Sequence, residues 1–429
     1  MKKGLLFAFM LAGLRLFGQS YDLAITEIMY NPDSSLNGQD WVELYNYGTT
    51  QIDISGWLLK SEDVLDEFEI PDGTILQPGE FKVIAQWEDT FHMVYPTVSN
   101  VIGDFEFGLD NGGGQVRLFN GGGAPVIQIS YGDTLPWPKS ADGYGMSLEV
   151  DDYTAELNDP SNWFGGCVGG SPGSEYSDCN YSVQLSEINY NSIFYHDSGD
   201  WIELVNSGIG AIDISDWSIR DSKDNNVFHI PAGTILEAGA HLVVCTDIFQ
   251  YTTYYPAIDN LIGDLGFGFS GQGDAVRIYD NEGILQYGLY YHDDPPWADE
   301  ADGNGFTLEL LDFYGTPNVP GAWTAGCPYG SPGTAIILPC PAAVEDYELL
   351  PFTAGPNPFN TALYLRSETV HNGLITITDL QGRPVYSTPW NGSLVWNGQN
   401  GSGEEVASGL YLVRLQSEKE QWSTLVVKE

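Results

Sequence analysis

Residues 40–46 read DWVELYN, and residues 200–206 read DWIELVN. Side chains along an extended strand alternate between the two faces of a sheet. Val42 and Leu44 are therefore expected on one face. Trp41, Glu43 and Tyr45 are expected on the other, more polar face. The alternation predicts a half-buried strand, and the second copy lies 160 residues after the first.

The same offset extends outward in both directions. ITEIMYN from Ile25 returns as LSEINYN from Leu185, and IPDGTIL from Ile70 returns as IPAGTIL from Ile230. The repeat ends beyond GSPG at Gly170, which returns at Gly330. A unit this long exceeds solenoid periods and indicates duplication of a whole domain. Short segments rich in Val, Ile, Tyr, Phe and Trp, separated by turn residues, predict an antiparallel β-sandwich in each copy.

In their order, these motifs resemble the lamin-tail domain, an immunoglobulin-like β-sandwich of nuclear lamins and of many bacterial exported proteins. The resemblance covers residues 21–179 and 183–340. It implies an all-β protein whose two tandem sandwiches are modules of adhesion, binding or scaffolding.

The repeat is absent from the C-terminal segment, which follows a linker at 341–350 within the Pro- and acid-rich run PCPAAVEDYELLP from Pro339. Within residues 351–429, a Pro-Asn-Pro-Phe entry, a DLQGR turn, a GLY strand and a basic end are formed by Pro356, Asn357, Pro358, Phe359, Asp379, Gly382, Arg383, Gly409, Tyr411 and Lys428. With these motifs in this order, the segment resembles the type A sorting domain of the type IX secretion system of Bacteroidota. The resemblance implies a third, small β-sandwich that is recognised by the secretion machinery and is usually removed after passage across the outer membrane.

Residues 1–18, MKKGLLFAFMLAGLRLFG, have the basic start and short apolar core of a secretory signal peptide. This core is too short to span a bilayer, and we expect no membrane-spanning segment elsewhere. We therefore expect Sec export to the periplasm, followed by secretion or retention on the outer cell surface.

The formal net charge is −44. So negative a chain repels phosphate backbones, which argues against a nucleic-acid partner, and attracts cations. Oxygen-rich segments at Glu62, Glu149 and His292 make structural Ca²⁺ a candidate, although none follows the DxDxDG calcium loop. Acidity that serves only solubility is the alternative. No organic cofactor is expected.

Five cysteines are present, and four of them form two pairs of similar spacing. In an exported protein we expect two local disulfides, Cys167 with Cys179 and Cys327 with Cys340. Cys245 lies in the strand-like run HLVVC, where a buried inert thiol is expected.

No catalytic motif is evident. The six histidines lack metal-ligand spacing, and no phosphate-binding loop of the GxxxxGK[ST] type occurs. Glu27, Asp40 and Glu43 recur at the 160-residue offset, which permits a shared site, but carboxylates that bond turn amides or line the rim of the sheet are the favoured explanation. Six further tryptophans recur in pairs and fit core positions: Trp57, Trp137, Trp163, Trp217, Trp297 and Trp323.

Trp41 and Trp201, on the polar face of their strand, are the candidates for an exposed binding face together with Glu43 and Glu203. We expect a non-catalytic surface protein that binds a glycan or protein ligand in adhesion or scaffolding. One alternative is a carbohydrate-binding accessory protein for polymer degradation. Another is an unrecognised hydrolase that would lose activity on Glu43→Gln or Glu203→Gln.

Overall fold

The computed structural model describes residues 21–36, 39–336, 338, 340, 353–367, 370–379, 382–417 and 421–429. The expected signal peptide (1–18) and linker (341–350) lie outside the described residues. The chain divides into two compact units, Met1–Ser192 with Ser198–Ile336, and Ile193–Asp197 with Ile337–Glu429. Both copies of the repeat thus belong to one unit.

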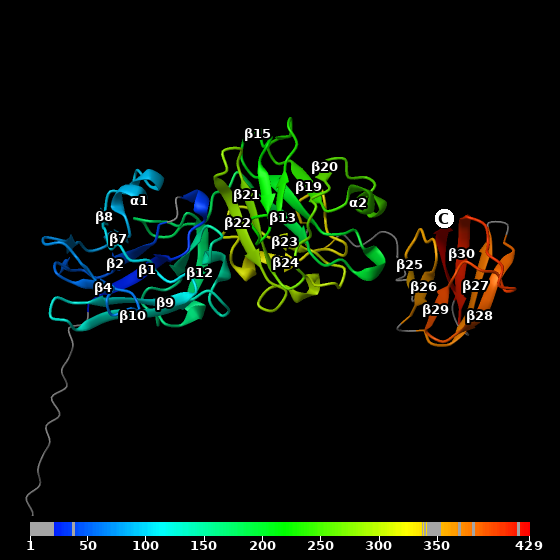
Figure 1. Ribbon diagram of the computed structural model, residues 1–429, viewed down its shortest axis with the longest axis horizontal. Coiled ribbons are helices and arrows are strands. Elements are labelled where there is room, and N and C mark those ends of the chain that lie inside the picture. Colours follow the sequence, from blue (N-terminus) through cyan, green and yellow to red (C-terminus); the bar gives the residue numbers. More distant parts are fainter. Residues whose placement is uncertain are drawn as a thin grey trace, which may run out of the picture. The chain divides into compact units, whose positions relative to one another are not determined.

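The first copy is a β-sandwich (Figure 1). A six-stranded sheet in the order β12-β11-β1-β2-β7-β8 faces a four-stranded sheet in the order β10-β9-β4-β5, and β3 pairs with β6. The strands are β1 (Leu23–Met29), β2 (Trp41–Asn46), β3 (Ile52–Asp53), β4 (Leu58–Lys60), β5 (Phe68–Glu69), β6 (Ile75–Leu76), β7 (Phe81–Ala85), β8 (Val101–Ile102), β9 (Gly113–Phe119), β10 (Pro125–Gly132), β11 (Met146–Val150) and β12 (Trp163–Val168).

In the second copy the strand order is the same, which confirms the duplication of an all-β domain. Its sheets run β20-β19-β14-β13-β23-β24 and β17-β16-β21-β22, with β15 paired to β18. The strands are β13 (Val183–Asn189), β14 (Trp201–Asn206), β15 (Ile212–Asp213), β16 (Ser218–Arg220), β17 (Val227–His229), β18 (Ile235–Leu236), β19 (His241–Cys245), β20 (Leu261–Gly263), β21 (Asp274–Tyr279), β22 (Leu285–Tyr291), β23 (Leu308–Leu310) and β24 (Trp323–Ala325).

Each sandwich has a core between its two sheets. In the first, Val42 and Leu44 point into this core, as the alternation of their strand predicted. Trp57, Trp137 and Trp163 lie in the same core, as expected for recurring tryptophans. In the second, Trp297 and Trp323 are buried in the equivalent core, and Trp217 packs against it half-buried. Burial of such large side chains dominates the stability of a sandwich.

The outer face of the six-stranded sheet is covered as well, which corrects one prediction. Trp41 and Trp201 were expected to be exposed, but both are buried. Trp41 packs edge-on against Phe91 of the short helix α1 (Glu88–Val94). Trp201 packs in the same way against Tyr251 of α2 (Ile248–Tyr254). The strand alternates as predicted, but its second face contacts protein instead of water.

The two sandwiches contact each other through a buried polar cluster. Tyr279 Oη donates to Asp33 Oδ2 at 2.6 Å, and Arg277 Nη1 lies 3.7 Å from the same oxygen. The backbone N–H of Leu285 donates to Ser35 Oγ at 3.0 Å. A buried charge is tolerated when it is paired and hydrogen-bonded, so these contacts fit the assignment of both sandwiches to one unit.

The C-terminal segment is a separate, smaller β domain. One sheet runs β25-β26-β29 and the other β28-β27-β30-β31, with Trp396 and Tyr411 in contact in the core. The strands are β25 (Thr353–Gly355), β26 (Leu363–Arg366), β27 (Gly373–Asp379), β28 (Pro384–Trp390), β29 (Ser393–Trp396), β30 (Gly409–Gln416) and β31 (Gln421–Lys428).

Two disulfides are present. Cys167 is bonded to Cys179, and Cys327 and Cys340 are disulfide-bonded as well. Within the described ranges, no helix combines the length and apolar character that a bilayer span needs.

Candidate functional site

Three glutamates stand side by side on neighbouring strands of the first sandwich. Glu27 of β1 is paired in register with Glu43 of β2 and with Glu149 of β11. All three are buried. They share the outer face of the sheet with Trp41, because alternate positions of β2 point the same way. Three carboxylates in one buried row need extensive hydrogen bonding.

The GSPG loop, residues 170–173, provides much of that bonding. The backbone N–H of Ser171 donates to Glu27 Oε1 at 2.9 Å, and its hydroxyl donates to Glu149 Oε1 at 2.8 Å. The N–H of Gly173 donates to Glu43 Oε2 at 2.6 Å. Gly170 has φ +73°, and a Cβ there would lie 2.0 Å from Glu27 Oε1, so only glycine fits. The motif is a cap over the carboxylates.

Hydroxyl groups on the strands complete the cluster. Thr26 Oγ1 donates to Glu43 Oε1 at 2.8 Å, and Ser147 Oγ donates to Glu27 Oε1 at 2.5 Å. Despite these donors, burial raises the pKa of Glu43 to about 8 and that of Glu149 to about 7. Burial and the charges of both neighbours raise the pKa of Glu27 well above its usual range. The row therefore holds protons near neutral pH.

The second sandwich repeats the cluster with Glu187, Glu203 and Glu309. There the N–H of Ser331 donates to Glu187 Oε1 at 3.1 Å, and the N–H of Gly333 donates to Glu203 Oε2. One partner is new. His241 Nδ1 lies 2.7 Å from Glu203 Oε1, in a hydrogen bond that the first copy does not form because Phe81 occupies the equivalent position.

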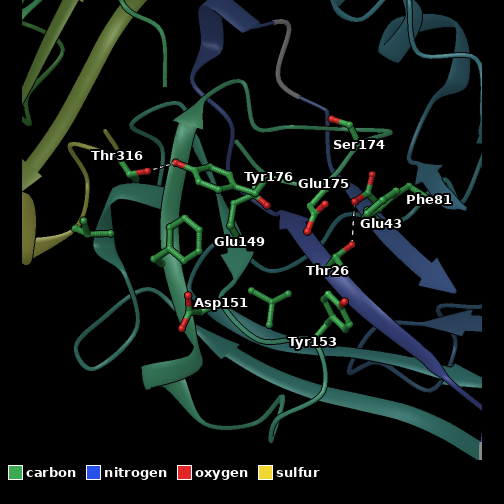
Figure 2. Close-up of a pocket in the computed structure, with 13 residues that line it drawn as sticks. Thr26, Glu43, Phe81, Glu149, Asp151, Tyr153, Ser174, Glu175, Tyr176 and Thr316 are labelled. Carbon is green, nitrogen blue, oxygen red and sulfur yellow. Dashed lines mark hydrogen bonds between the residues drawn. The ribbon is translucent and has the colours of Figure 1, made fainter. Parts of the chain in front are cut away.

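Beside the first cluster lies a pocket of about 330 Å³, here called the acidic pocket (Figure 2). Four carboxylates and four aromatic rings contribute to it. Its walls are formed by Thr26, Glu43, Phe81, Glu149, Val150, Asp151, Tyr153, Phe164, Ser174, Glu175, Tyr176, Thr316 and Val319. Thr316 and Val319 belong to the second sandwich, and Tyr176 forms a hydrogen bond with Thr316. The volume is at the lower end of the range for small-molecule sites.

The expected site residues divide into two groups. Glu43 reaches the acidic pocket and Glu203 the equivalent cluster, whereas Trp41 and Trp201 lie beneath the helices. Glu149, expected only as part of an oxygen-rich segment, lies in β11 beside Glu27, and the sequence did not indicate the part that Tyr153 and Tyr176 play. GSPG and Glu27 both recur after 160 residues, and this shared offset was the one sign in the sequence that the loop and the glutamate are structurally linked.

Asp40 and its equivalent Asp200 accept hydrogen bonds from backbone N–H groups of a loop. Asp40 Oδ2 accepts from the N–H of Leu109 at 2.6 Å, and Asp200 Oδ2 accepts from the N–H of Phe269 at 2.8 Å. These bonds hold a distant loop against the start of β2 or β14. The alternative role foreseen for strand-end carboxylates, bonding to loop amides, applies to both.

One further group of potential metal ligands occurs in the described part of the chain, at His292, Asp293 and Asp294. His292 already bonds its neighbours, because its Nδ1 accepts from the N–H of Asp294 at 3.1 Å and lies 3.1 Å from Asp293 Oδ1. Cys245 is free and buried, and burial raises the pKa of its thiol to about 11.

In the sorting-like segment, the motif residues connect its strands. Asn357 Oδ1 accepts from the N–H of Val427 at 2.7 Å, and Phe359 and Trp396 pack together in the core. Arg383 donates to Asp379 across the turn at 2.7 Å. Lys428 Nζ bonds Glu405 at 3.0 Å and is itself buried. Its ammonium group is thus part of the folded domain.

Tandem immunoglobulin-like β-sandwiches with a separate β tail define the class of this protein. The Lamin Tail Domain model matches residues 18–133 and 180–292, which together exceed half of the chain. The chain therefore belongs to the lamin tail domain family. The model of the secretion system C-terminal sorting domain matches residues 355–429. The protein is accordingly an exported type IX secretion substrate that interacts with the secretion machinery and is destined for the cell surface or the medium.

No curated protein matches the chain. Among solved structures, PorZ of Porphyromonas gingivalis, described as an essential surface component of the type IX secretion system, is similar at 12% identity and a TM-score of 0.18. That alignment covers 96% of this chain and 52% of PorZ. Latent PorU of the same organism aligns at 9% identity and a TM-score of 0.15, over 95% of this chain and 34% of PorU. The chain thus spans about half of PorZ and a third of PorU.

Proposed function

We propose that the tandem sandwiches form a non-catalytic binding protein of the cell surface, acting in adhesion or scaffolding. The observation that carries this proposal is the acidic pocket, a concave site on a domain that the sorting tail exports. Export places that site where external ligands are available.

The bonding of the carboxylates supports a binding role over a hydrolytic one. A glycosidase or other acid–base enzyme needs one carboxyl free to transfer a proton and another free to attack or to activate water. Glu27 and Glu43 each accept bonds from a strand hydroxyl and a loop amide. These carboxylates are therefore held in place by the fold.

A carbohydrate ligand is the second candidate, although not through the tryptophans first considered. Tyr45 stacks on Phe81 with ring centroids 4.1 Å apart, and Tyr153 contacts both Tyr45 and Tyr47. All four rings are half-buried and lie at or next to the acidic pocket. Aromatic rings that are only partly buried can stack on sugars.

The full exported chain should be applied to a glycan array and an array of surface proteins, with product analysis of every bound polymer. We expect reversible binding with no release of products. Turnover of a polysaccharide that is lost in Glu43→Gln would contradict the proposal. Binding to glycans that is weakened by Tyr153→Ala would select the carbohydrate alternative.

A further inference from the structure

We propose that the acidic pocket of the first sandwich binds a protonated alkylamine, the charged end of a diamine or of a lysine side chain. This inference rests on the proposed binding function and names the chemistry of its ligand. It comes from comparing the two copies of the domain at equivalent positions.

The second copy supplies its own basic group to the cluster. His241 of β19 is nine-tenths buried, and its Nδ1 lies 2.7 Å from Glu203 Oε1. The hydroxyl of Ser186 also reaches that ring nitrogen, at 3.4 Å. In the first copy Thr26, Glu43 and Phe81 occupy these three positions. Glu203 is thus paired with an imidazole, whereas in the described part of the chain its equivalent Glu43 is bonded by Thr26 and Gly173 and by no basic side chain.

Two further residues that line the acidic pocket are acidic in the first copy and uncharged in the second. Asp151 and Glu175 of the first copy correspond to Leu311 and Ala335 of the second. Among the described residues that line the acidic pocket, four are acidic and none is basic. At these two positions the first copy thus has carboxylates where the second has uncharged side chains. An external cation fits this difference better than an anion or a neutral ligand.

The shape of the pocket favours an organic cation. Glu43 and Glu149 are buried and provide oxygens for an ammonium group, while Asp151 and Glu175 are exposed. Tyr153, Phe164 and Tyr176 also line the pocket, and aromatic rings suit both methylene groups and a nearby cation. A diamine can place its second charge near the exposed carboxylates, so diamines should bind more tightly than monoamines.

Charge neutralisation supports the same ligand. Burial raises the pKa of Glu43 to about 8, so near neutral pH this carboxyl is largely protonated in the free protein. An ammonium ion favours the ionised form. Binding should therefore release a proton from the cluster, which calorimetry detects as a dependence of the binding heat on the buffer.

The test is titration calorimetry of the full exported chain with cadaverine near neutral pH and at physiological salt. We expect saturable binding with proton release. Phe81→His should weaken it at least about tenfold, because the introduced imidazole can bond Glu43 as His241 bonds Glu203. Glu43→Gln should weaken it to a similar degree. Since histidine occupies the equivalent position in a folded copy, Phe81→His is expected to fold.

Asp72→Asn is the matched control. Asp72 is an exposed carboxylate outside the acidic pocket, and the second copy has Ala232 there, so this variant removes one charge from the same sandwich. It should bind cadaverine as the wild type does. Equal affinity of Asp72→Asn, Glu43→Gln and Phe81→His for cadaverine would show that only the net charge of the sandwich matters, and would overturn the proposal. Absence of cadaverine binding to the wild type would overturn it as well.

Two further arms identify the source of the amine. A lysine-containing peptide that binds, and loses binding on lysine acetylation, indicates a protein partner; binding of cadaverine alone indicates a free diamine. If cadaverine fails to bind while the glycan or protein arrays still show a ligand, the amine assignment fails and the binding function stands. Product release in those arrays would instead remove the binding function.

Discussion

Replacing Glu43 by Gln should flatten the pH dependence of the stability of the first sandwich. Burial raises the pKa of Glu43 from 4.5 to about 8 in the folded protein. Between these values the folded state holds a proton that the unfolded state has lost. The free energy of unfolding must therefore be highest at acidic pH and fall as the pH rises toward 8.

The magnitude follows from that shift. Each group of this kind contributes a slope of about 1.4 kcal/mol per pH unit between its unfolded and folded pKa values. Glu43 alone then accounts for roughly 3–4 kcal/mol between about pH 5 and pH 8, because the slope falls off near the folded pKa. Glutamine is neutral at every pH and removes this contribution. The variant should match the wild type near pH 5 and exceed it in stability near pH 8.

The assay is urea unfolding at a series of pH values and constant ionic strength. Hydrogen exchange of peptides from β1 and β2, read by mass spectrometry, restricts the signal to the first sandwich. Glu149 and Asp40, whose pKa values burial raises to about 7, should leave a residual slope in the variant. Asp72→Asn controls for the loss of one charge. Parallel curves for wild type and Glu43→Gln from pH 5 to pH 8 would refute the reasoning.

Three other outcomes are expected. Asp33→Ala removes the acceptor of Tyr279 and the partner of Arg277 between the sandwiches. The free energy of unfolding should fall by about 1–3 kcal/mol, and a calorimetric transition shared by the two sandwiches should split in two. An unchanged single transition would contradict this. Reduction of Cys167–Cys179, which are 12 residues apart and enclose the GSPG loop, should destabilise the first sandwich by about 2–3 kcal/mol, measured by thermal melting against a Cys167→Ser, Cys179→Ser double variant. Cys245, buried and with its pKa raised to about 11, should react with a thiol reagent at mildly alkaline pH only after unfolding; rapid labelling of the native chain would show that it is accessible.

The sequence was most informative where contacts are local or repeated. Alternation in DWVELYN placed Val42 and Leu44 correctly in the core, and the 160-residue offset predicted two equivalent sandwiches. The spacing of Cys167 and Cys179 indicated their bond. All of these depend on strand periodicity, on chain separation or on comparison of the copies, and none requires knowledge of the tertiary arrangement.

Long-range covering of the sheet could not be predicted in the same way. Trp41 is buried by a helix of only seven residues, too short for a clear helical period. Glu43 accepts from Gly173, which lies 130 residues further along the chain. Alternation alone distinguishes the two faces of a strand, but it does not show whether the second face meets water. Exposure of Trp41 was therefore the wrong expectation, although its face was assigned correctly.

The second sandwich contributes Thr316 and Val319 to the wall of a pocket whose other described lining residues come from the first. Duplication has thus given one module a neighbour that completes the wall of its pocket. A graft of the first module into an unrelated protein would carry the glutamates but leave that wall behind. Under the proposed binding function, selection on this pocket would act on both copies, because Thr316 and Val319 come from the second.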